Sequence, residues 1–170
     1  VEPTYISNYG KGDIAAGDNW QPGNVEITDD FVAQVSKYVN YCTPIMTAAE
    51  VVEIESRVSL TRILHPGFEL NGAKLETFGT ADFVCFHDNT LTIVDLKFGK
   101  GEQVYAEQNP QLMLYALGAL MEFGFLYDIK TLRLVIHQPR RDHVDEWEIG
   151  VTELRAWADS KLKIAVLDAT

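Results

Sequence analysis

The sequence predicts an α/β fold in which helices cover both faces of a β-sheet. Segments typical of strands, with alternating or continuous apolar residues, occupy 51–60, 79–86, 91–98 and 131–138. Segments with apolar residues at helical spacing lie before, between and after them. The two middle strand segments are apolar on both faces, which predicts that both faces are covered.

The length and composition fit one globular domain. The chain has 170 residues, and domains commonly contain ~100–200 residues. Hydrophobic residues make up 46% of the chain, which is too high for a disordered protein. We expect a single domain over 28–170 and a loop-rich segment over 1–27, which contains glycine and proline but no steady period. The first residue is Val1 and not Met, which suggests part of a longer chain.

Charge and cysteine content exclude several classes of protein. The chain has 14 Lys and Arg residues against 25 Asp and Glu residues, a net charge of −11. A protein that binds phosphate by bulk charge is therefore excluded, and nucleic-acid contact would need a local basic patch or a bound metal. Cys42 and Cys85 are too few for a disulfide framework or a four-cysteine zinc or iron–sulfur site. No membrane-spanning segment or signal peptide is expected.

The first elements are a helix over 29–41 and a strand over 51–60. Thr28 is a typical N-cap, and acidic residues follow it in the first turn. Pro44 is expected to close the helical region. The strand alternates, with Val52, Ile54, Val58 and Leu60 expected on one face. A connecting loop is expected over 61–76.

The remaining elements are a hairpin, a helix, two strands and a last helix. The hairpin joins 79–86 to 91–98 through a turn at His87–Thr90. Asn109 as cap and Pro110 as first residue predict a helix that ends near Gly124. Strands are expected over 131–138 and 144–149. Thr152 is expected to cap a last helix with the apolar stripe Leu154, Trp157, Ala158, Leu162, Ala165 and Val166.

The hairpin register places two carboxylates opposite each other. A two-residue turn at Asp88–Asn89 puts Asp82 directly opposite Asp95, with Cβ atoms ~5 Å apart. Two such charges repel by about 3 kcal/mol at an effective dielectric constant of ~20. The fold can tolerate this if one carboxylate keeps its proton, or if a divalent cation lies between them.

Lys97 favours the cation, because it projects from the same face of the strand as Asp95. Oxygen ligands of this kind suit Mg²⁺ or Mn²⁺ and not zinc. Such a metal lowers the pKa of a bound water, and the ammonium can hold the resulting hydroxide. The alternative is that Lys97 only neutralises two structural aspartates.

Further candidates surround these three residues. Gln111 and Tyr115 share one helical face and could orient a nucleotide or hold the lysine, although an ordinary half-buried helix face has the same pattern. A third carboxylate could come from Glu50, Glu53 or Glu55, each of which could equally be a surface residue. Possible phosphate contacts, with scattered surface charge as the alternative, are Lys100, Arg57, Arg62, Arg140 and Arg141. Lys100 is the strongest of them, since it lies in a glycine-flanked loop beside Lys97. The histidines show no paired metal spacing.

Three short motifs carry a family resemblance. Gly79-Thr80-Ala81-Asp82, Asp95-Leu96-Lys97 and Gln111-Leu112-Met113-Leu114-Tyr115 occur in this order. Together they resemble the PD-(D/E)XK nuclease superfamily, in particular its RecB-type and CRISPR-associated exonucleases and their phage-encoded relatives. The resemblance extends over roughly residues 50–140.

The resemblance implies a restriction-endonuclease-like core, with a central mixed sheet flanked by helices. It implies that Asp82, Asp95 and the Leu96 backbone carbonyl ligate Mg²⁺ or Mn²⁺, and Glu55 is the best match for a further acidic ligand. Lys97 would position or activate the attacking water. Gln111 and Tyr115 would contact substrate or support the lysine. No iron–sulfur cluster is expected.

The implied function is a metal-dependent DNA nuclease, with an exonuclease as the favoured mode. It would act in phage-type replication, recombination or repair in the cytoplasm of a bacterial host. DNA is the implied partner, and a phage recombination or single-strand-binding protein is a further candidate. The alternatives are an inactive nuclease-like module that binds DNA or protein, and a structural virion or assembly component without metal affinity.

Overall fold

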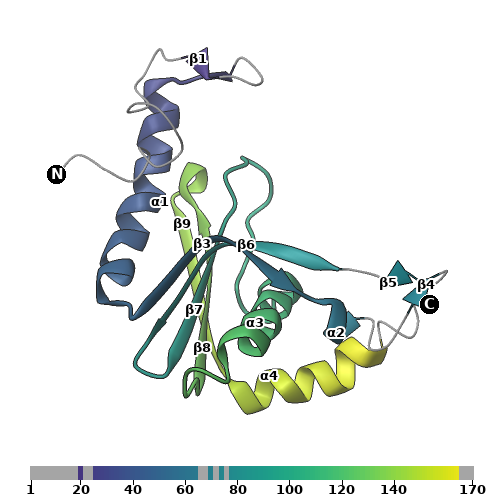
Figure 1. Cartoon of the computed structure of the whole chain (residues 1–170). Coiled ribbons are helices and arrows are strands. Elements are labelled where there is room, and N and C mark those ends of the chain that lie inside the picture. Colours follow the sequence, from purple (N-terminus) through teal and green to yellow (C-terminus); the bar gives the residue numbers. More distant parts are fainter. Residues whose placement is uncertain (1–18, 21–24, 65–68, 71–72, 75–76, 165–170) are drawn as a thin grey trace.

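A five-stranded sheet forms the centre of the computed structural model, which describes residues 19–20, 25–64, 69–70, 73–74 and 77–164. The strand order is β3-β6-β7-β8-β9 (Figure 1). These strands are β3 (Val51–Ser59), β6 (Phe78–His87), β7 (Thr90–Leu96), β8 (Thr131–Gln138) and β9 (His143–Gly150). All neighbours are antiparallel except β7 and β8, which are parallel. The α/β fold class with a mixed sheet is therefore confirmed.

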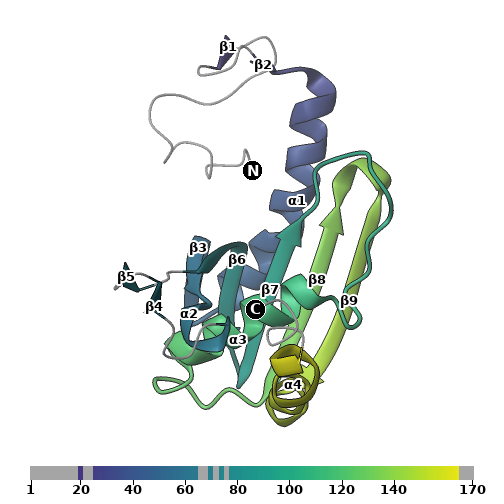
Figure 2. The ribbon, with the colours of Figure 1, turned by 90° about the vertical axis from the view of Figure 1, so that its right-hand side faces the viewer.

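Helices cover both faces of this sheet, as the apolar hairpin predicted. The long helix α1 (Asp29–Ala48) lies on one face, and α3 (Pro110–Phe123) and α4 (Val151–Trp157) lie on the other (Figures 1 and 2). On the α1 side, Cys42 packs with Phe83, Cys85, Val94 and Val135. On the α3 side, the larger cluster includes Leu91, Ile93, Leu112, Met113, Ala116 and Leu134. We call these two surfaces the α1 face and the α3 face.

Helix α1 begins as predicted and ends later than predicted. The Thr28 side chain accepts a hydrogen bond from Phe31 N at 3.2 Å, which confirms the N-cap. The helix continues through Pro44 to Ala48, so the expectation that Pro44 ends it was wrong. Proline removes only the bond to the Asn40 carbonyl, and Asn40 is exposed, so water can replace that bond. Packing of Ile45 and Met46 on the α1-face cluster keeps the last turn in place.

Strand β3 does not keep the alternation that its sequence suggests. Val52 packs on the α1 face, whereas Val58 belongs to the α3-face cluster. The residues between them include Glu55, which has a φ of 53°. A left-handed residue changes which face the following side chains occupy, so placing Val52 and Val58 on one face was wrong. The alternation of strand β6 is interrupted at the same level. Ala81 and Val84 are three residues apart and would lie on opposite faces of a regular strand, but both lie on the α3 face.

The shorter elements complete the fold. Strands β1 (Asn19–Trp20) and β2 (Val25–Glu26) pair within the segment expected to be loop. In the expected loop over 61–76 lie α2 (Thr61–Leu64) and the paired strands β4 (Glu69–Leu70) and β5 (Ala73–Lys74). The 3₁₀ turn η1 (Pro139–Arg141) joins β8 to β9, and the π-helical segment η2 (Ala158–Leu162) continues α4. The loop predictions for 1–18, 21–24, 65–68, 71–72 and 75–76 lie outside the described residues.

The later elements follow the predicted boundaries closely. Helix α3 starts at Pro110 after the Asn109 cap and ends before Gly124. Helix α4 starts at Val151 with Gly150 as its cap, so the expectation of Thr152 as N-cap was wrong. Leu154 is fully buried, while Ala165 and Val166 lie outside the described residues. No helix in the described part of the chain is long and apolar enough to cross a membrane.

Gly118 of α3 lets the helix approach β3 closely. A Cβ atom at this position would lie 3.0 Å from Val58 Cβ and 3.3 Å from Ser59 O. We expect Gly118→Leu to lower the free energy of unfolding by roughly 1–3 kcal/mol, because the larger side chain forces the helix off the sheet. Urea unfolding followed by circular dichroism measures this change. Glu122→Leu, on the exposed side of the same helix, is the control and should change the midpoint little. Equal midpoints for both variants would contradict this packing.

Candidate functional site

The hairpin between β6 and β7 has the predicted register. Asp88 and Asn89 have φ values of 45° and 64°, as a two-residue type I′ turn requires. Pairing runs from His87 with Thr90 to Phe83 with Val94. The ladder then stops one residue before Asp82 and Asp95, so these two do not form the expected ladder pair. Instead, Asp82 Oδ2 accepts a hydrogen bond from Leu96 N at 2.6 Å.

The ladder on the other side of Asp82 is also interrupted. Strand β3 pairs Ile54 with Phe83 and Ser56 with Ala81, and leaves Glu55 unpaired between them. A φ of 53° at Glu55 costs on the order of 1–2 kcal/mol for a side chain with a Cβ atom. Such distortions are common next to functional sites, where the surrounding structure holds them. Asp82 therefore lies at the point where β6 loses its regular pairing with both neighbours.

Asp95 and Lys97 lie next to this irregular point, at the end of β7 and just beyond it. Asp95 is only 3% exposed. Its Oδ2 atom lies 2.8 Å from Lys97 Nζ. This contact is an ion pair outside hydrogen-bonding geometry, and Oδ2 has no hydrogen-bond donor among the described residues. The Lys97 ammonium therefore supplies the positive charge that a buried carboxylate needs.

Gln111 and Tyr115 of α3 are connected to this region by hydrogen bonds that start at Lys97. Lys97 Nζ donates to Gln111 Oε1 at 2.7 Å, and Gln111 Nε2 donates to Tyr115 Oη at 2.9 Å. The Asn109 side chain caps the helix by accepting from Gln111 N at 3.0 Å, which fixes where Gln111 lies. The Tyr115 ring lies against Gly79, where any Cβ atom would collide with it. The structure thus brings the three sequence motifs together.

The electrostatics at Asp82 show which groups are close to it. Burial is the main cause that raises the pKa of Asp82, and the hydrogen bond from Leu96 N opposes this shift. The charges of Asp95 and Glu55 raise the pKa further, and the charge of Lys97 lowers it. Three acidic groups and one ammonium therefore share one region, and the acidic groups outnumber the ammonium.

Two residues that the sequence did not single out support this region from the α1 face. The Tyr38 hydroxyl is buried beside the Cys42 thiol. Burial mainly raises the pKa of Tyr38, and the charges of Cys42, Asp82 and Glu55 add to the shift. The Tyr38 ring packs edge-on against His137 at 5.5 Å. The backbone oxygen of His137 accepts from Lys97 N at 2.9 Å.

No sequence signal could have identified these two residues. Tyr38 is one member of an ordinary apolar helix stripe, and His137 has no metal-type spacing to another histidine. His137 is 4% exposed, and burial, with the charge of Lys37, lowers its pKa and favours the neutral ring. Only the packing of α1 on β8 brings the Tyr38 ring against His137 and the Tyr38 hydroxyl near Asp82.

Three of the five expected phosphate contacts lie near the ends of β7 and β8, and the other two, Arg57 and Arg62, lie on β3 and α2. Lys100 is close to Asp30, since its charge contributes to lowering the pKa of Asp30, after the hydrogen bonds from Gln34 and Arg140. Arg140 Nη2 lies 3.3 Å from Asp30 Oδ2, and Arg141 Nη1 donates to Gly101 O at 2.8 Å. The guanidinium of Arg57 instead lies 3.5 Å from the centroid of the Phe78 ring. Lys100, Arg140 and Arg141 therefore gather at one end of the sheet, whereas Arg57 lies on β3.

A second group of possible metal ligands lies at the turn end of β6. The ligand atoms of Glu50, His87 and Asp88 all lie within 4.8 Å of one another, and all three residues are exposed. His87 Nε2 is 3.2 Å from Asp88 Oδ2. No role was predicted for His87, and Glu50 was predicted only as a possible third carboxylate beside Asp82 and Asp95. Glu50 lies instead at this opposite end of the strand, and Glu53 is an exposed residue of β3.

Comparison with known proteins identifies the family of the chain. Residues 8–170 match the family described as "Protein of unknown function (DUF2800)". The chain belongs to this family. The DUF2800 match includes Glu55, Asp82, Asp95 and Lys97, so the candidate site lies within the family region.

One similar solved structure is titled "Crystal structure of SSO0001". The two chains are 14% identical, with a TM-score of 0.33, and the match covers 73% of this chain and 53% of the other. The DUF2800 chain thus spans about half the length of that protein.

The raised pKa of Asp82 predicts a stability effect for this DUF2800 chain. A carboxyl whose pKa is higher in the folded state loses its stabilising contribution as the pH rises through that value. Near pH 7, without divalent cations, Asp82→Asn should therefore be more stable than the original protein. The advantage should shrink as the pH falls from 7 toward 4. Urea midpoints at several pH values measure it. Glu122→Gln, an exposed control, should show no such trend, and a less stable Asp82→Asn at pH 7 would refute the prediction.

Proposed function

We propose that this chain is a Mg²⁺- or Mn²⁺-dependent nuclease that hydrolyses phosphodiester bonds in DNA. The observation that carries the proposal is the buried Asp95 carboxylate, which belongs to a group of three acidic side chains that share a single ammonium. It lies beside Lys97 and within electrostatic range of Asp82. The resemblance of the three motifs to PD-(D/E)XK nucleases supports the same conclusion.

The donor set fits a hard divalent cation. Asp82, Asp95 and Glu55 offer only carboxylate oxygens, and the Leu96 carbonyl is a further oxygen ligand in this proposal. Oxygen donors of this type favour Mg²⁺ or Mn²⁺ over zinc. The excess of negative charge around Asp82 is what a cation would neutralise. When bound, the ion supplies an acidified water and polarises a phosphoryl oxygen.

Lys97 is the residue that we propose to position the attacking water. Its ammonium has three N–H donors. One donates to Gln111 Oε1, and Asp95 Oδ2 is in ion-pair contact. A remaining donor can hold a water or a phosphate oxygen. Gln111 is oriented in turn by Tyr115, so the pair keeps the ammonium at a defined place, and both side chains can contact the substrate.

We propose that DNA runs over the end of the sheet that carries Lys100, Arg140 and Arg141. Because the net charge is −11, contact with DNA needs a local basic surface or a bound metal, and these three residues can provide the basic surface. Arg140 is paired with the exposed Asp30. Exposed ion pairs contribute only ~0–1 kcal/mol, so a phosphate can compete with this aspartate. A phage recombination or single-strand-binding protein remains a candidate partner in this setting.

The test of the proposal combines cleavage and metal binding. We expect Lys97→Ala to slow Mg²⁺- or Mn²⁺-dependent DNA cleavage by about 10²–10⁴-fold, because the water loses its positioning group. Calorimetric titration should show Mn²⁺ binding that Asp95→Asn abolishes. The control is Lys161→Ala, an exposed lysine on η2, which should leave both measurements unchanged.

One observation favours a second function, an inactive nuclease-like module that binds DNA or protein. The ion pair with Lys97 already neutralises Asp95, as a purely structural pair would. This alternative predicts no cleavage by the metal-loaded protein, even where DNA binds. Absence of both cleavage and Mn²⁺ binding would instead favour a structural component.

The mode of cleavage can be tested on two substrates side by side. For an exonuclease, we expect end-labelled linear DNA to be degraded while covalently closed circular DNA persists, since a circle offers no end. Gel analysis of both substrates, with Mn²⁺ and with EDTA, measures this difference. Nicking or linearisation of the circle would show endonuclease activity and overturn the exonuclease assignment.

A further inference from the structure

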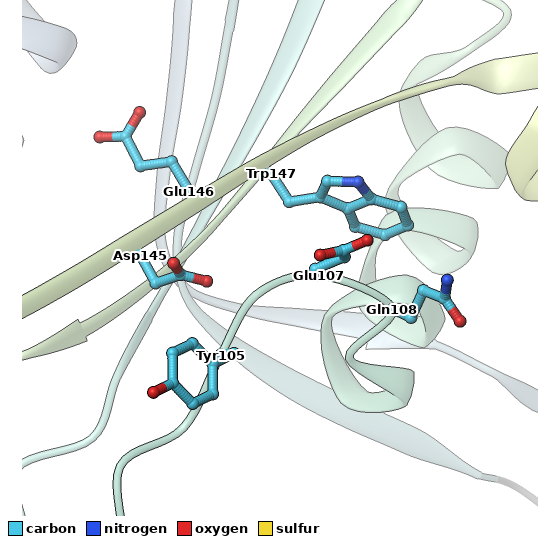
Figure 3. Close-up of a pocket in the computed structure, with 6 residues that line it drawn as sticks. All are labelled: Tyr105, Glu107, Gln108, Asp145, Glu146 and Trp147. Carbon is cyan, nitrogen blue, oxygen red and sulfur yellow. The ribbon is translucent and has the colours of Figure 1, made fainter.

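A cavity of about 380 Å³ lies outside the candidate metal site, at the edge of the sheet (Figure 3). The loop that leads into α3 forms one wall and the edge strand β9 forms the other. The lining residues are Tyr105, Glu107, Gln108, Asp145, Glu146 and Trp147. No lysine or arginine is among them.

The sheet register places this cavity close to Asp95. Asp145 of β9 pairs with Ile136 of β8, and Ile136 pairs with Asp95 of β7. Asp95 and Asp145 are therefore two strands apart in one row, about 10 Å from each other at the usual strand spacing. The Asp95 and Asp145 carboxylates are therefore close in the sheet, but different side chains and backbone groups surround each of them.

The carboxylates of the cavity are not equivalent. Asp145 Oδ2 accepts from Ala106 N at 2.6 Å, which holds the loop against β9. The Glu146 carboxylate is directed to the opposite side of the strand, where Arg133 Nη2 lies at 2.7 Å (Figure 3). Glu107 is exposed and makes no hydrogen bond or ion pair with the described residues. The cavity thus carries the uncompensated charges of Glu107 and Asp145.

Two aromatic rings complete the walls. Tyr105 is 57% exposed, and its ring is held edge-on against His143 at 5.5 Å. Trp147 is partly buried, with its inner side packed against the α3-face core. Figure 3 shows both rings on the same side of β9 as the carboxylates of Glu107 and Asp145. Ring faces together with carboxylates attract organic cations, because both present negative potential.

We propose that this cavity binds a lysine or arginine side chain from an extended basic segment of a partner protein. Its volume suits one long side chain. Strand β9 is the last strand of the sheet, and apart from β8 no described backbone segment hydrogen-bonds to it. An added strand could pair with that open edge while its basic side chain enters the cavity. This inference does not depend on nuclease activity.

Other occupants fit less well. Nucleic acid brings phosphates, which Glu107 and Asp145 would repel. A metal ion would need several oxygen ligands, but the Glu146 carboxylate is directed to Arg133 on the opposite side of the strand, which leaves only the carboxylates of Glu107 and Asp145 at the cavity (Figure 3). A cationic side chain needs no more than the charge and ring faces that the cavity offers.

The test uses two nine-residue peptides with β-branched flanking residues. One has a central arginine, and the other has citrulline, its neutral analogue, at the same place. In ¹⁵N-labelled protein, we expect the arginine peptide to shift the amide signals of Tyr105, Glu107 and Trp147 in a saturable way. The citrulline peptide should bind at least fivefold more weakly. Equal binding of both peptides, or no shift with either, would overturn the proposal.

Variants locate the binding within the cavity. Glu107→Gln should weaken the arginine peptide about two- to fivefold, as expected for one partly exposed charge pair. Glu153→Gln, an exposed glutamate on α4, is the matched control and should not change the affinity. Unchanged affinity in Glu107→Gln would refute the assignment. Larger shifts of the same signals with a short single-stranded oligonucleotide, or shifts on concentrating the protein alone, would also refute it, in favour of nucleic acid or a second copy.

Discussion

The hydrogen bond from Leu96 N to Asp82 Oδ2 is the interaction on which the candidate site depends. At this point a side chain replaces the backbone partner that a regular ladder would provide, so no buried N–H group is left unsatisfied. The replacement lets β6 separate from both neighbours while the rest of the sheet stays paired. A carboxylate can do this because it accepts strongly from backbone N–H groups. The same bond also fixes Asp82 beside the end of β7, where Asp95 and Lys97 lie.

The surrounding structure supplies the stability that this arrangement lacks. Burial of Asp82 and the left-handed Glu55 both oppose folding. Two hydrophobic cores, one on each face of the sheet, offset these costs. Both cores include side chains of the hairpin strands β6 and β7. On the α3 face the Tyr115 ring reaches the backbone only because position 79 is glycine. The glycine of the first motif therefore has a packing role, and the aspartate three residues later has an electrostatic one.

Local signals in the sequence were enough for the parts of the fold that depend on neighbouring residues. The caps at Thr28 and Asn109, and the hairpin register set by Asp88 and Asn89, follow from local geometry and were confirmed. The continuation of α1 through Pro44 could not be foreseen, because contacts with a distant strand stabilise it. The change of face at Glu55 also depends on tertiary structure, since nothing in an alternating strand marks one residue as left-handed. Tyr38 and His137 enter the site only through the packing of α1 on β8.

One loop connects the two groups of carboxylates on the α3 face. Buried Gln138 anchors its start, accepting from Val104 N at 2.8 Å and donating to Glu102 O at 3.0 Å. Ala106 N then bonds to Asp145, and the loop ends in the cap that positions Gln111 against Lys97. Asp95 and Asp145 flank the same residue of β8, yet one faces an ammonium and the other a neutral N–H group. The two aspartates hold equivalent positions in the sheet, so their different surroundings come from the loop. The loop places Ala106 N on Asp145, and its end positions the Gln111 side chain that holds Lys97 beside Asp95.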